Sequence, residues 1–297
     1  MTSIILPTYN RATLLMESIQ SVLQQSYTDF ELIVMDDGSD DNTSGLVGNI
    51  QDSRVKYHHM PRSGYTGRLK NFAIRQALGE YIAFIDSDDM WKPGKLERQV
   101  QLLEENPSIG FSITDVTTFK GDKILIDHSY QLQDTTQFIN IFQKMKESRF
   151  LVYPSTLIMR KSCFERTGYF DETMLSGDFH FNMRLAYHFD AAVIFETLLW
   201  RRVHDSNMSE QIPIENYKEF VDTFDYLYKS KMIEKKFQRQ ARSLAHYKLG
   251  KVYASKGDQK NARRHFMISL KSKLYNPPCI YHLLNTLMPG TTASQGA

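Results

Sequence analysis

Three aspartates follow an apolar run, and they are the residues of this chain best suited to chemistry. The run 81–85 (Tyr-Ile-Ala-Phe-Ile) leads directly into Asp86, Asp88 and Asp89. Its composition, after the turn residue Gly79, predicts a buried strand. Neighbouring carboxylates repel one another unless a positive charge joins them, and a divalent cation bound to an oxyanion is the simplest candidate. The pattern therefore predicts a metal site at a strand end, with a helix cap at Asp88 or Asp89 as the simpler alternative.

The segments before these aspartates alternate between strand and helix. Strands are predicted over 3–6, 31–35, 54–58 and 80–85, and helices over 12–25, from 43 onward and over 68–78. This order is typical of a parallel sheet with crossover helices. The carboxyl ends of parallel strands share one edge of the sheet, where ligands bind in open α/β folds. We therefore expect residues 7–11, 36–39 and 86–89 to line one crevice.

The remaining pattern predicts two further parts of the chain. Helices are expected over 92–105, 135–146 and 176–188, with strands over 109–118, 155–159 and 191–202. From about residue 214 the pattern is wholly helical, with segments near 215–230, 234–255, 258–272 and 278–287. We predict an α/β domain over 1–210, a basic helical module over 211–290 and a disordered tail over 291–297.

Charge separates these parts. Residues 211–297 hold 15 Lys and Arg against 6 Asp and Glu, whereas residues 1–210 hold 21 against 28. The basic module could face anionic lipid, although a solvated helical surface is the simpler interpretation. No run approaches the ~20 apolar residues of a membrane span, and the first 20 residues lack a signal-peptide pattern. Together with two distant cysteines, Cys163 and Cys279, this predicts a cytoplasmic protein, in contact with the inner membrane face if the module binds lipid.

Three common phosphate and acyl-transfer motifs are missing from the sequence. No Gly-x-Gly-x-x-Gly follows the first strand, and no Gly-x-x-x-x-Gly-Lys-Ser/Thr or Gly-x-Ser-x-Gly occurs anywhere. A crevice of this kind would hold phosphates through a metal and not through a glycine loop.

Five segments, in order, resemble the motifs of family 2 glycosyltransferases with the GT-A fold: residues 3–11, 31–40, 79–89, 168–172 and 202–209. The resemblance covers about residues 1–210. It implies a Rossmann-like, mostly parallel α/β sheet flanked by helices, with the all-helical module added. It also implies a metal-dependent, inverting transfer from a nucleotide-sugar, a UDP-sugar in our interpretation, to an acceptor hydroxyl in surface polysaccharide or glycolipid assembly.

The resemblance assigns roles on the donor side. Pro7, Thr8 and Tyr9 would line the base, and Asp37 would accept a hydrogen bond from a uracil-like edge. Asp86 would reach the ribose or the metal shell. The simpler interpretations are a plain turn at 36–38 and a surface aromatic at Tyr9.

The resemblance also assigns the metal and the base. Asp88 would ligate Mn²⁺ or Mg²⁺ bridging the diphosphate, His204 could approach the same metal, and Asp89 would support the loop. Asp178 would be the general base for the acceptor hydroxyl; it follows Gly177, where the family usually shows Glu-Asp. The alternatives are a loop histidine at 204 and an N-cap at 178.

Basic residues near the crevice are less clearly assigned. Arg11 and Arg68 are the expected partners of the nucleotide-sugar. Many family members carry Arg-Asn before the strand of the aspartates, whereas this chain has Lys70-Asn71. Either Arg68 or Lys70 could therefore meet the nucleotide. Arg201 or Arg202 could contact phosphate, and a surface role is the alternative.

Other features concern partners and rival functions. The expected partners are a nucleotide-sugar donor and a saccharide or lipid-linked acceptor, without nucleic acid. Residues 249–266 are similar to a single tetratricopeptide repeat, with a plain helical cap as the alternative.

A nucleotidyltransferase and a nucleotide-sugar-binding scaffold protein are the rival functions. The first would normally show a Gly-rich loop after its first strand, and the second would not need both metal-site and base aspartates.

Overall fold

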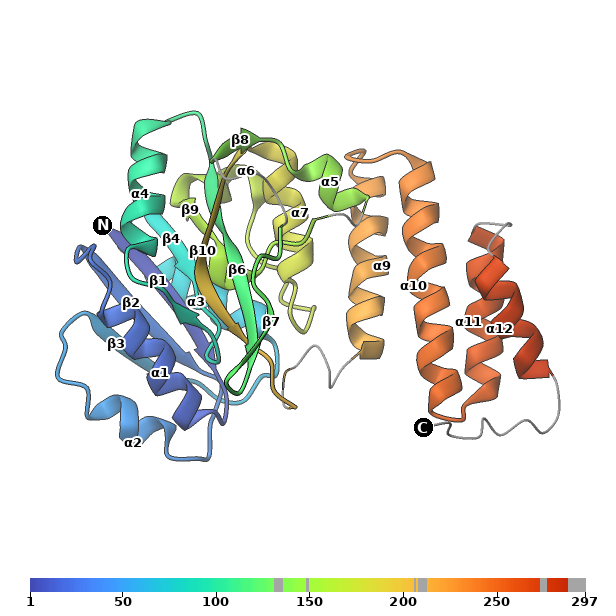
Figure 1. Ribbon diagram of the computed structural model, residues 1–297, viewed down its shortest axis with the longest axis horizontal. Coiled ribbons are helices and arrows are strands. Elements are labelled where there is room, and N and C mark those ends of the chain that lie inside the picture. Colours follow the sequence, from blue (N-terminus) through green and yellow to red (C-terminus); the bar gives the residue numbers. More distant parts are fainter. Residues whose placement is uncertain (131–135, 148–149, 206, 208–212, 273–276, 288–297) are drawn as a thin grey trace. The chain divides into compact units, whose positions relative to one another are not determined.

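The computed structural model describes residues 1–130, 136–147, 150–205, 207, 213–272 and 277–287 (Figure 1). The chain divides into two compact units, Met1–His204 and Asp205–Ala297, and each is described by itself. The predicted domain boundary near 210 and the predicted disordered tail over 291–297 lie outside the described residues.

The first unit is built on one mixed sheet, which has ten strands among the described residues (Figure 1). In spatial order these are β3 (Val55–His59), β2 (Phe30–Asp36), β1 (Thr2–Thr8), β4 (Tyr81–Phe84), β9 (Ile158–Arg160), β6 (Phe111–Lys120), β10 (Ala191–Arg202) and β5 (Met90–Trp91). Two further strands, β7 (Lys123–Ile126) and β8 (Gln137–Ile139), pair with β6 and β10. The four strands from β3 to β4 run parallel, whereas β9 is antiparallel to both of its neighbours.

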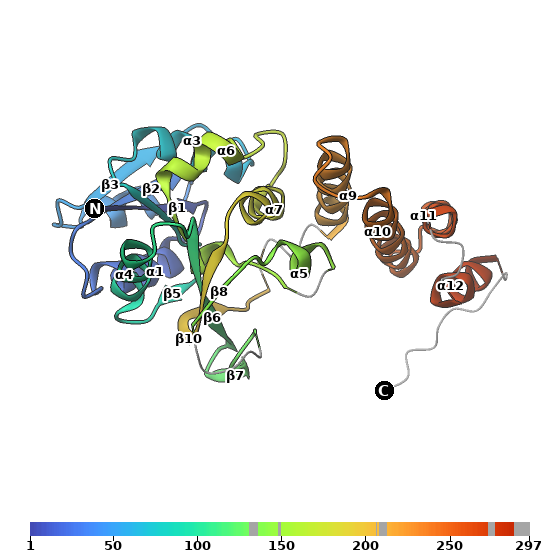
Figure 2. The ribbon, with the colours of Figure 1, turned by 90° about the horizontal axis from the view of Figure 1, so that it is seen from above.

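Helices cover both faces of this sheet (Figure 2). On one face lie α1 (Ala12–Leu23) and α4 (Lys95–Glu105), and on the other lie α3 (Thr66–Gln76), α6 (Phe164–Thr167) and α7 (Asp178–His188). Shorter elements are α2 (Thr43–Gly48), η1 (Pro154–Thr156), η2 (Lys161–Cys163) and α5 (Phe142–Lys146). Because both faces are covered, all seven residues of β1 and of β2 are buried. The predicted α/β fold class is confirmed, and the parallel strands bring their carboxyl ends to one edge.

The structure corrects the prediction between residues 135 and 160. The predicted helix 135–146 is strand β8 followed by helix α5. Asn140 explains the break, because its side chain donates to the carbonyl of Ala186 and accepts from the amide of Phe142. The predicted strand 155–159 begins only at Ile158, after the short turn η1.

The helix cap proposed as the simpler role for Asp88 or Asp89 is wrong. Helix α4 begins at Lys95, and its N-cap is Gly94, which has a left-handed φ of 79°. The two aspartates precede strand β5, which a two-residue apolar pattern could not predict.

The second unit contains helices α9 (Pro213–Lys229), α10 (Lys235–Ser255), α11 (Gln259–Ser272) and α12 (Pro277–Leu287). Each lies within two residues of its predicted bounds. A small residue stands where α10 packs on α11: a Cβ at Gly250 would lie 2.4 Å from the ring of Phe266. No helix in the described part of the chain is long and apolar enough to cross a bilayer.

Gly250→Ala is expected to destabilise the second unit by about 1–3 kcal/mol, because the added methyl group cannot fit beside Phe266 without a shift of the helices. Denaturant unfolding followed by circular dichroism measures the change. Gly48→Ala is the control, since a Cβ there meets nothing within 4 Å. Equal stability of the two variants would contradict the close packing at Gly250.

Candidate active site

Asp88 is the centre of a charged cluster at the carboxyl edge of the sheet. Its Oδ2 lies 2.7 Å from Nη1 of Arg11 and 2.9 Å from Nε2 of His204. These three residues come from the segments after β4, β1 and β10. The fold thus brings Asp88 into contact with Arg11, 77 positions away in the sequence, and with His204, 116 positions away.

The donor types of this cluster suit a divalent cation, because carboxylate oxygen and imidazole nitrogen are common metal ligands. In this structure Oδ2 of Asp88 and Nε2 of His204 lie at hydrogen-bond distance, 2.9 Å apart. Within the described part of the chain, no group of three or more His, Cys, Asp or Glu residues could hold a metal. A cation here would therefore take its remaining ligands from substrate phosphates and water, as Mg²⁺ commonly does.

Asp89 anchors the loop 86–89 through hydrogen bonds to neighbouring segments. Its carboxylate accepts hydrogen bonds from Oγ of Ser155 at 2.6 Å and from the amide of Arg202 at 3.2 Å. The hydroxyl of Ser18 donates to the carbonyl of Asp89 at 2.6 Å. Burial, followed by the charges of Asp86 and Asp88, raises the pKa of Asp89 well above its usual range. These contacts agree with the supporting role predicted for this residue.

Arg202 also braces the loop. Its Nε donates to the carbonyl of Asp88 at 3.2 Å, and its guanidinium pairs with Glu17 on α1. The neighbouring Arg201 lies over the ring of Tyr153, 5.0 Å from its centre. Both arginines therefore contact other side chains or backbone groups of the protein.

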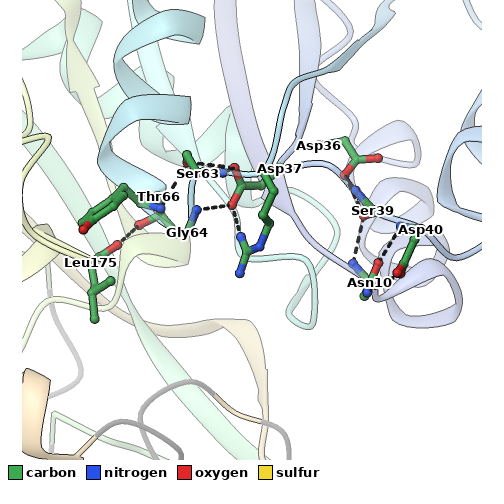
Figure 3. Close-up of polar contacts among 11 residues, drawn as sticks. Asn10, Asp36, Asp37, Ser39, Asp40, Ser63, Gly64, Thr66 and Leu175 are labelled. Carbon is green, nitrogen blue, oxygen red and sulfur yellow. Dashed lines mark hydrogen bonds and ion pairs between the residues drawn. The ribbon is translucent and has the colours of Figure 1, made fainter.

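Asp37 is saturated by hydrogen bonds (Figure 3). Its Oδ1 accepts from the amide and the hydroxyl of Ser63, both at 2.8 Å, and its Oδ2 accepts from the amide of Gly64 at 2.8 Å and pairs with Arg62. A carboxylate offers about four lone-pair sites, so all are engaged. Arg62 also stacks on Tyr9, with its guanidinium 3.6 Å from the ring centre. Arg62 thus occupies the place where the base was predicted to lie.

Sequence reasoning missed Arg62, because a single arginine in a loop carries no periodic or motif signal. It is the half-exposed member of the pair with Asp37. A base edge can therefore reach Asp37 if it displaces the side chain of Arg62, while Ser63 and Gly64 stay in place.

A second hydrogen-bond network joins the first two strand ends (Figure 3). The amide of Asn10 donates to Oγ of Ser39 at 2.9 Å, and its side chain exchanges two hydrogen bonds with Asp40. Ser39 in turn donates to the buried Asp36. Burial acts to raise the pKa of Asp36, but the hydrogen bonds from Ser39 and Tyr57 outweigh it and lower the pKa. Pro7 and Thr8 end β1 beside this network, with the carbonyl of Thr8 accepting from the amide of Asp37.

Asp178, at the start of α7, faces a buried cation. Its Oδ1 pairs with Nζ of Lys70, and its Oδ2 accepts from the hydroxyl of Ser176 at 2.8 Å. The Lys70 side chain is 1% exposed. Arg68, by contrast, donates to the carbonyl of Glu172 at 3.3 Å and lies over Tyr65. Of the two candidate cations, Lys70 is therefore the one that contacts a predicted site residue.

Asp86 interacts electrostatically with both Asp88 and Asp178. Burial is the main cause that raises its pKa to about 6. The Lys70 charge opposes that shift, whereas the charges of Asp178 and Asp88 add to it. The charges of Asp178, the candidate base, and of Asp88, the candidate metal ligand, therefore both act on the pKa of Asp86.

Open α/β proteins bind ligands at the carboxyl edge of the sheet, where the acids of this chain gather, and the comparisons specify the family. The model of glycosyl transferase family 2 matches residues 3–167. The chain belongs to this family.

Among curated relatives, the Escherichia coli UDP-Glc:alpha-D-GlcNAc-diphosphoundecaprenol beta-1,3-glucosyltransferase WfgD is 42% identical over 104 residues, which is 35% of this chain and 41% of WfgD. The putative teichuronic acid biosynthesis glycosyltransferase TuaG of Bacillus subtilis is 34% identical over 127 residues, 42% of this chain and 50% of TuaG. The matched segment spans only 15–21% of three Rickettsia relatives that also match.

Solved structures share the fold. S. aureus TarS 1-349 superposes with a TM-score of 0.68 at 20% identity, covering 91% of this chain and 80% of that one. A TarS structure in complex with UDP-GlcNAc gives 0.67 at 20% identity, over 96% and 79% of the two chains. The mannosyltransferase PcManGT from Pyrobaculum calidifontis, in complex with GDP-Man and Mn²⁺, gives 0.61 at 18% identity over 96% and 79%.

Proposed function

We propose that this protein transfers a sugar from a nucleotide-sugar to an acceptor hydroxyl with inversion at the anomeric carbon. The observation that carries the proposal is that one family 2 domain holds both the contacts of Asp88 with Arg11 and His204 and the ion pair of Asp178 with the buried Lys70. The first cluster suits a diphosphate leaving group, and the second suits an acceptor hydroxyl.

The donor is a UDP-sugar in this proposal. The names of WfgD and of the TarS complex include UDP-Glc and UDP-GlcNAc, which supports the choice of nucleotide. The base would lie along Pro7, Thr8 and Tyr9, with its edge toward Asp37 after Arg62 moves aside. Asp86 would accept from the ribose, and Arg11 would meet the diphosphate.

Mn²⁺ or Mg²⁺ would be held by Asp88 and His204, whose carboxylate and imidazole donors suit such ions. When bound, the ion stabilises the negative charge of the departing nucleoside diphosphate. The presence of Mn²⁺ in the PcManGT complex supports the choice of cofactor. The protein's own part is to hold Asp88 in place through Arg11, Asp89 and Arg202.

The acceptor hydroxyl is activated by Asp178. Its proton passes to the Asp178 carboxylate while its oxygen forms the bond to the anomeric carbon. The bond from that carbon to the phosphate oxygen breaks, and its electron pair leaves with the nucleoside diphosphate. Attack from the face opposite the leaving group gives inversion.

The acceptor is a saccharide, and a lipid-linked diphosphate sugar is the form we propose. The names of WfgD and TuaG, which include a diphosphoundecaprenol substrate and teichuronic acid biosynthesis, support an acceptor of surface polysaccharide assembly. The contacts of Arg68 are with Glu172 and Tyr65, so its place at the nucleotide stays a proposal that rests on the family resemblance.

The helical unit would contact the inner membrane face from the cytoplasm. Lys260, Arg264 and Lys271 are exposed at helical spacing on α11, and the exposed Met267 lies among them. On α12, Ile280, Tyr281 and Leu284 are exposed on one face. A basic surface with apolar side chains is suited to anionic lipid. The family match ends at residue 167. It therefore does not test the resemblance of residues 249–266 to a tetratricopeptide repeat, which remains a prediction.

Lys260→Glu together with Arg264→Glu is expected to weaken binding to vesicles that contain phosphatidylglycerol by at least about tenfold, since each basic residue near an anionic surface contributes about 1 kcal/mol. Vesicle co-sedimentation measures this, with phosphatidylcholine vesicles as the lipid control and Lys123→Glu as the protein control. Unchanged binding, or equal binding to neutral vesicles, would contradict the lipid contact.

Calorimetry with UDP and UDP-sugars tests the proposed function. We expect binding in the presence of Mn²⁺ that a chelator weakens at least about tenfold. A scaffold protein would bind the same ligands without turnover, and a nucleotidyltransferase would bind nucleoside triphosphate and release pyrophosphate. Indifference to both metal and nucleotide would contradict the proposal.

A further inference from the structure

Helix α3 packs against residues 170–178, the segment that leads to Asp178. The amide of Thr66 donates to the carbonyl of Leu175 at 3.0 Å (Figure 3). Asn71 and the backbone of Phe170 exchange two hydrogen bonds, each 3.0 Å long. A Cβ at Gly67 would lie 3.0 Å from the carbonyl oxygen of Asp171, so the segment lies directly against the helix. Residues 170–178 are thus anchored to α3 at several points.

Lys70 adds a charged contact between this helix and Asp178. Its Nζ lies 5.2 Å from the ring centre of Phe170 and 5.8 Å from that of Phe84, and the side chain is 1% exposed. An ammonium in such apolar surroundings is costly unless an ionised partner contacts it. Asp178 is the residue that forms the ion pair with it.

The two oxygens of Asp178 are distinguished by this arrangement. Oδ1 forms the ion pair with Nζ of Lys70, whereas Oδ2 accepts a hydrogen bond from the hydroxyl of Ser176. The Asp178 side chain is 21% exposed, so a substrate hydroxyl can reach it. The charged groups that face Asp178 are Lys70 on α3 and Asp86 after β4.

We propose that Lys70 is a positioning residue for the base: it pairs with Oδ1 of Asp178, so that Oδ2 takes the proton of the acceptor hydroxyl. This inference rests on the proposed function, in which Asp178 is the base. The proton leaves the hydroxyl oxygen for Oδ2, and the freed electron pair forms the glycosidic bond.

Lys70→Met and Lys70→Arg test the inference, with UDP release measured over a range of donor concentrations. We expect Lys70→Met to lower kcat at least about a hundredfold while the KM for the donor changes less than about threefold, because the donor binds elsewhere. Lys70→Arg, which keeps the charge, should recover most of the turnover.

Lys161→Met is the matched control, because Lys161 is a half-buried lysine that donates to the backbone carbonyl of Ala77. A loss in Lys70→Met that Lys70→Arg does not recover, that comes with an equal loss of donor affinity, or that equals the loss in Lys161→Met would overturn the inference. If Lys70→Met does not fold, Lys70→Gln and Lys70→Arg carry the same comparison.

A double-mutant cycle that combines Lys70→Met with Asp178→Asn separates the inference from the proposed function. In that background Lys70→Met should cause little further loss of turnover, because the two residues act as one unit. If the wild-type protein releases no UDP, the proposed function fails, and the ion pair is then tested by the melting temperatures of the same four proteins. Additive effects on the melting temperature would contradict the pairing of Lys70 with Asp178.

Discussion

Asp178→Asn is expected to lower kcat at least about a thousandfold and to leave the affinity for UDP within about threefold of wild type. A general base contributes about 10²–10⁴ to the rate, and asparagine keeps the shape of the side chain while it cannot take the proton. The nucleotide is bound by other strand ends, so its affinity should persist. UDP release and calorimetry on the same preparation measure the two quantities.

Asp190→Asn is the control for this variant, because Asp190 is exposed at the far end of α7. It should keep wild-type turnover. If Asp178→Asn also kept wild-type turnover, Asp178 would not be the base. If it lost nucleotide affinity in the same proportion, its role would be structural.

Asp88→Asn is expected to have the second largest effect. It removes the charged ligand of the proposed cation site, and stabilisation of the leaving group by a metal is worth several kcal/mol, so kcat should fall by about 10²–10³. In the same variant the affinity for UDP should no longer depend on Mn²⁺. Calorimetry with Mn²⁺ and with chelator measures this difference directly.

Two controls accompany Asp88→Asn. His204→Ala removes the second proposed ligand and should weaken the dependence on Mn²⁺ at least about tenfold. Asp122→Asn changes an exposed aspartate in the turn between β6 and β7 and should have no effect. A variant of Asp88 that kept the full dependence on Mn²⁺ would place the cation elsewhere.

The strand ends could be predicted because their sequence signal is local. β1, β2 and β4 are buried on both faces, so they appear as continuous apolar runs followed by polar residues. The rule that parallel strands end at one edge then placed Asp88 near Arg11. The four helices of the second unit were predictable for the same reason, since their apolar spacing is regular.

Contacts between distant side chains could not be predicted. Lys70 and Asp178 are 108 positions apart, and no local pattern indicates that they form a pair. Arg62 covers Tyr9 and Asp37 because of the path of its loop, which has neither helical nor strand spacing. Asn140 separates β8 from α5 within the predicted helix 135–146 through hydrogen bonds with Ala186 and Phe142, and the first of these depends on the tertiary fold.

Product analysis of a reaction with a UDP-sugar, Mn²⁺ and a saccharide or lipid-diphosphate acceptor is the most direct test of the proposed transfer. We predict release of one UDP for each sugar transferred, an inverted anomeric configuration in the product, and loss of both when a chelator is added. Release of pyrophosphate, retention of configuration, or binding of the donor without any transfer across the panel of acceptors would contradict the proposed transfer.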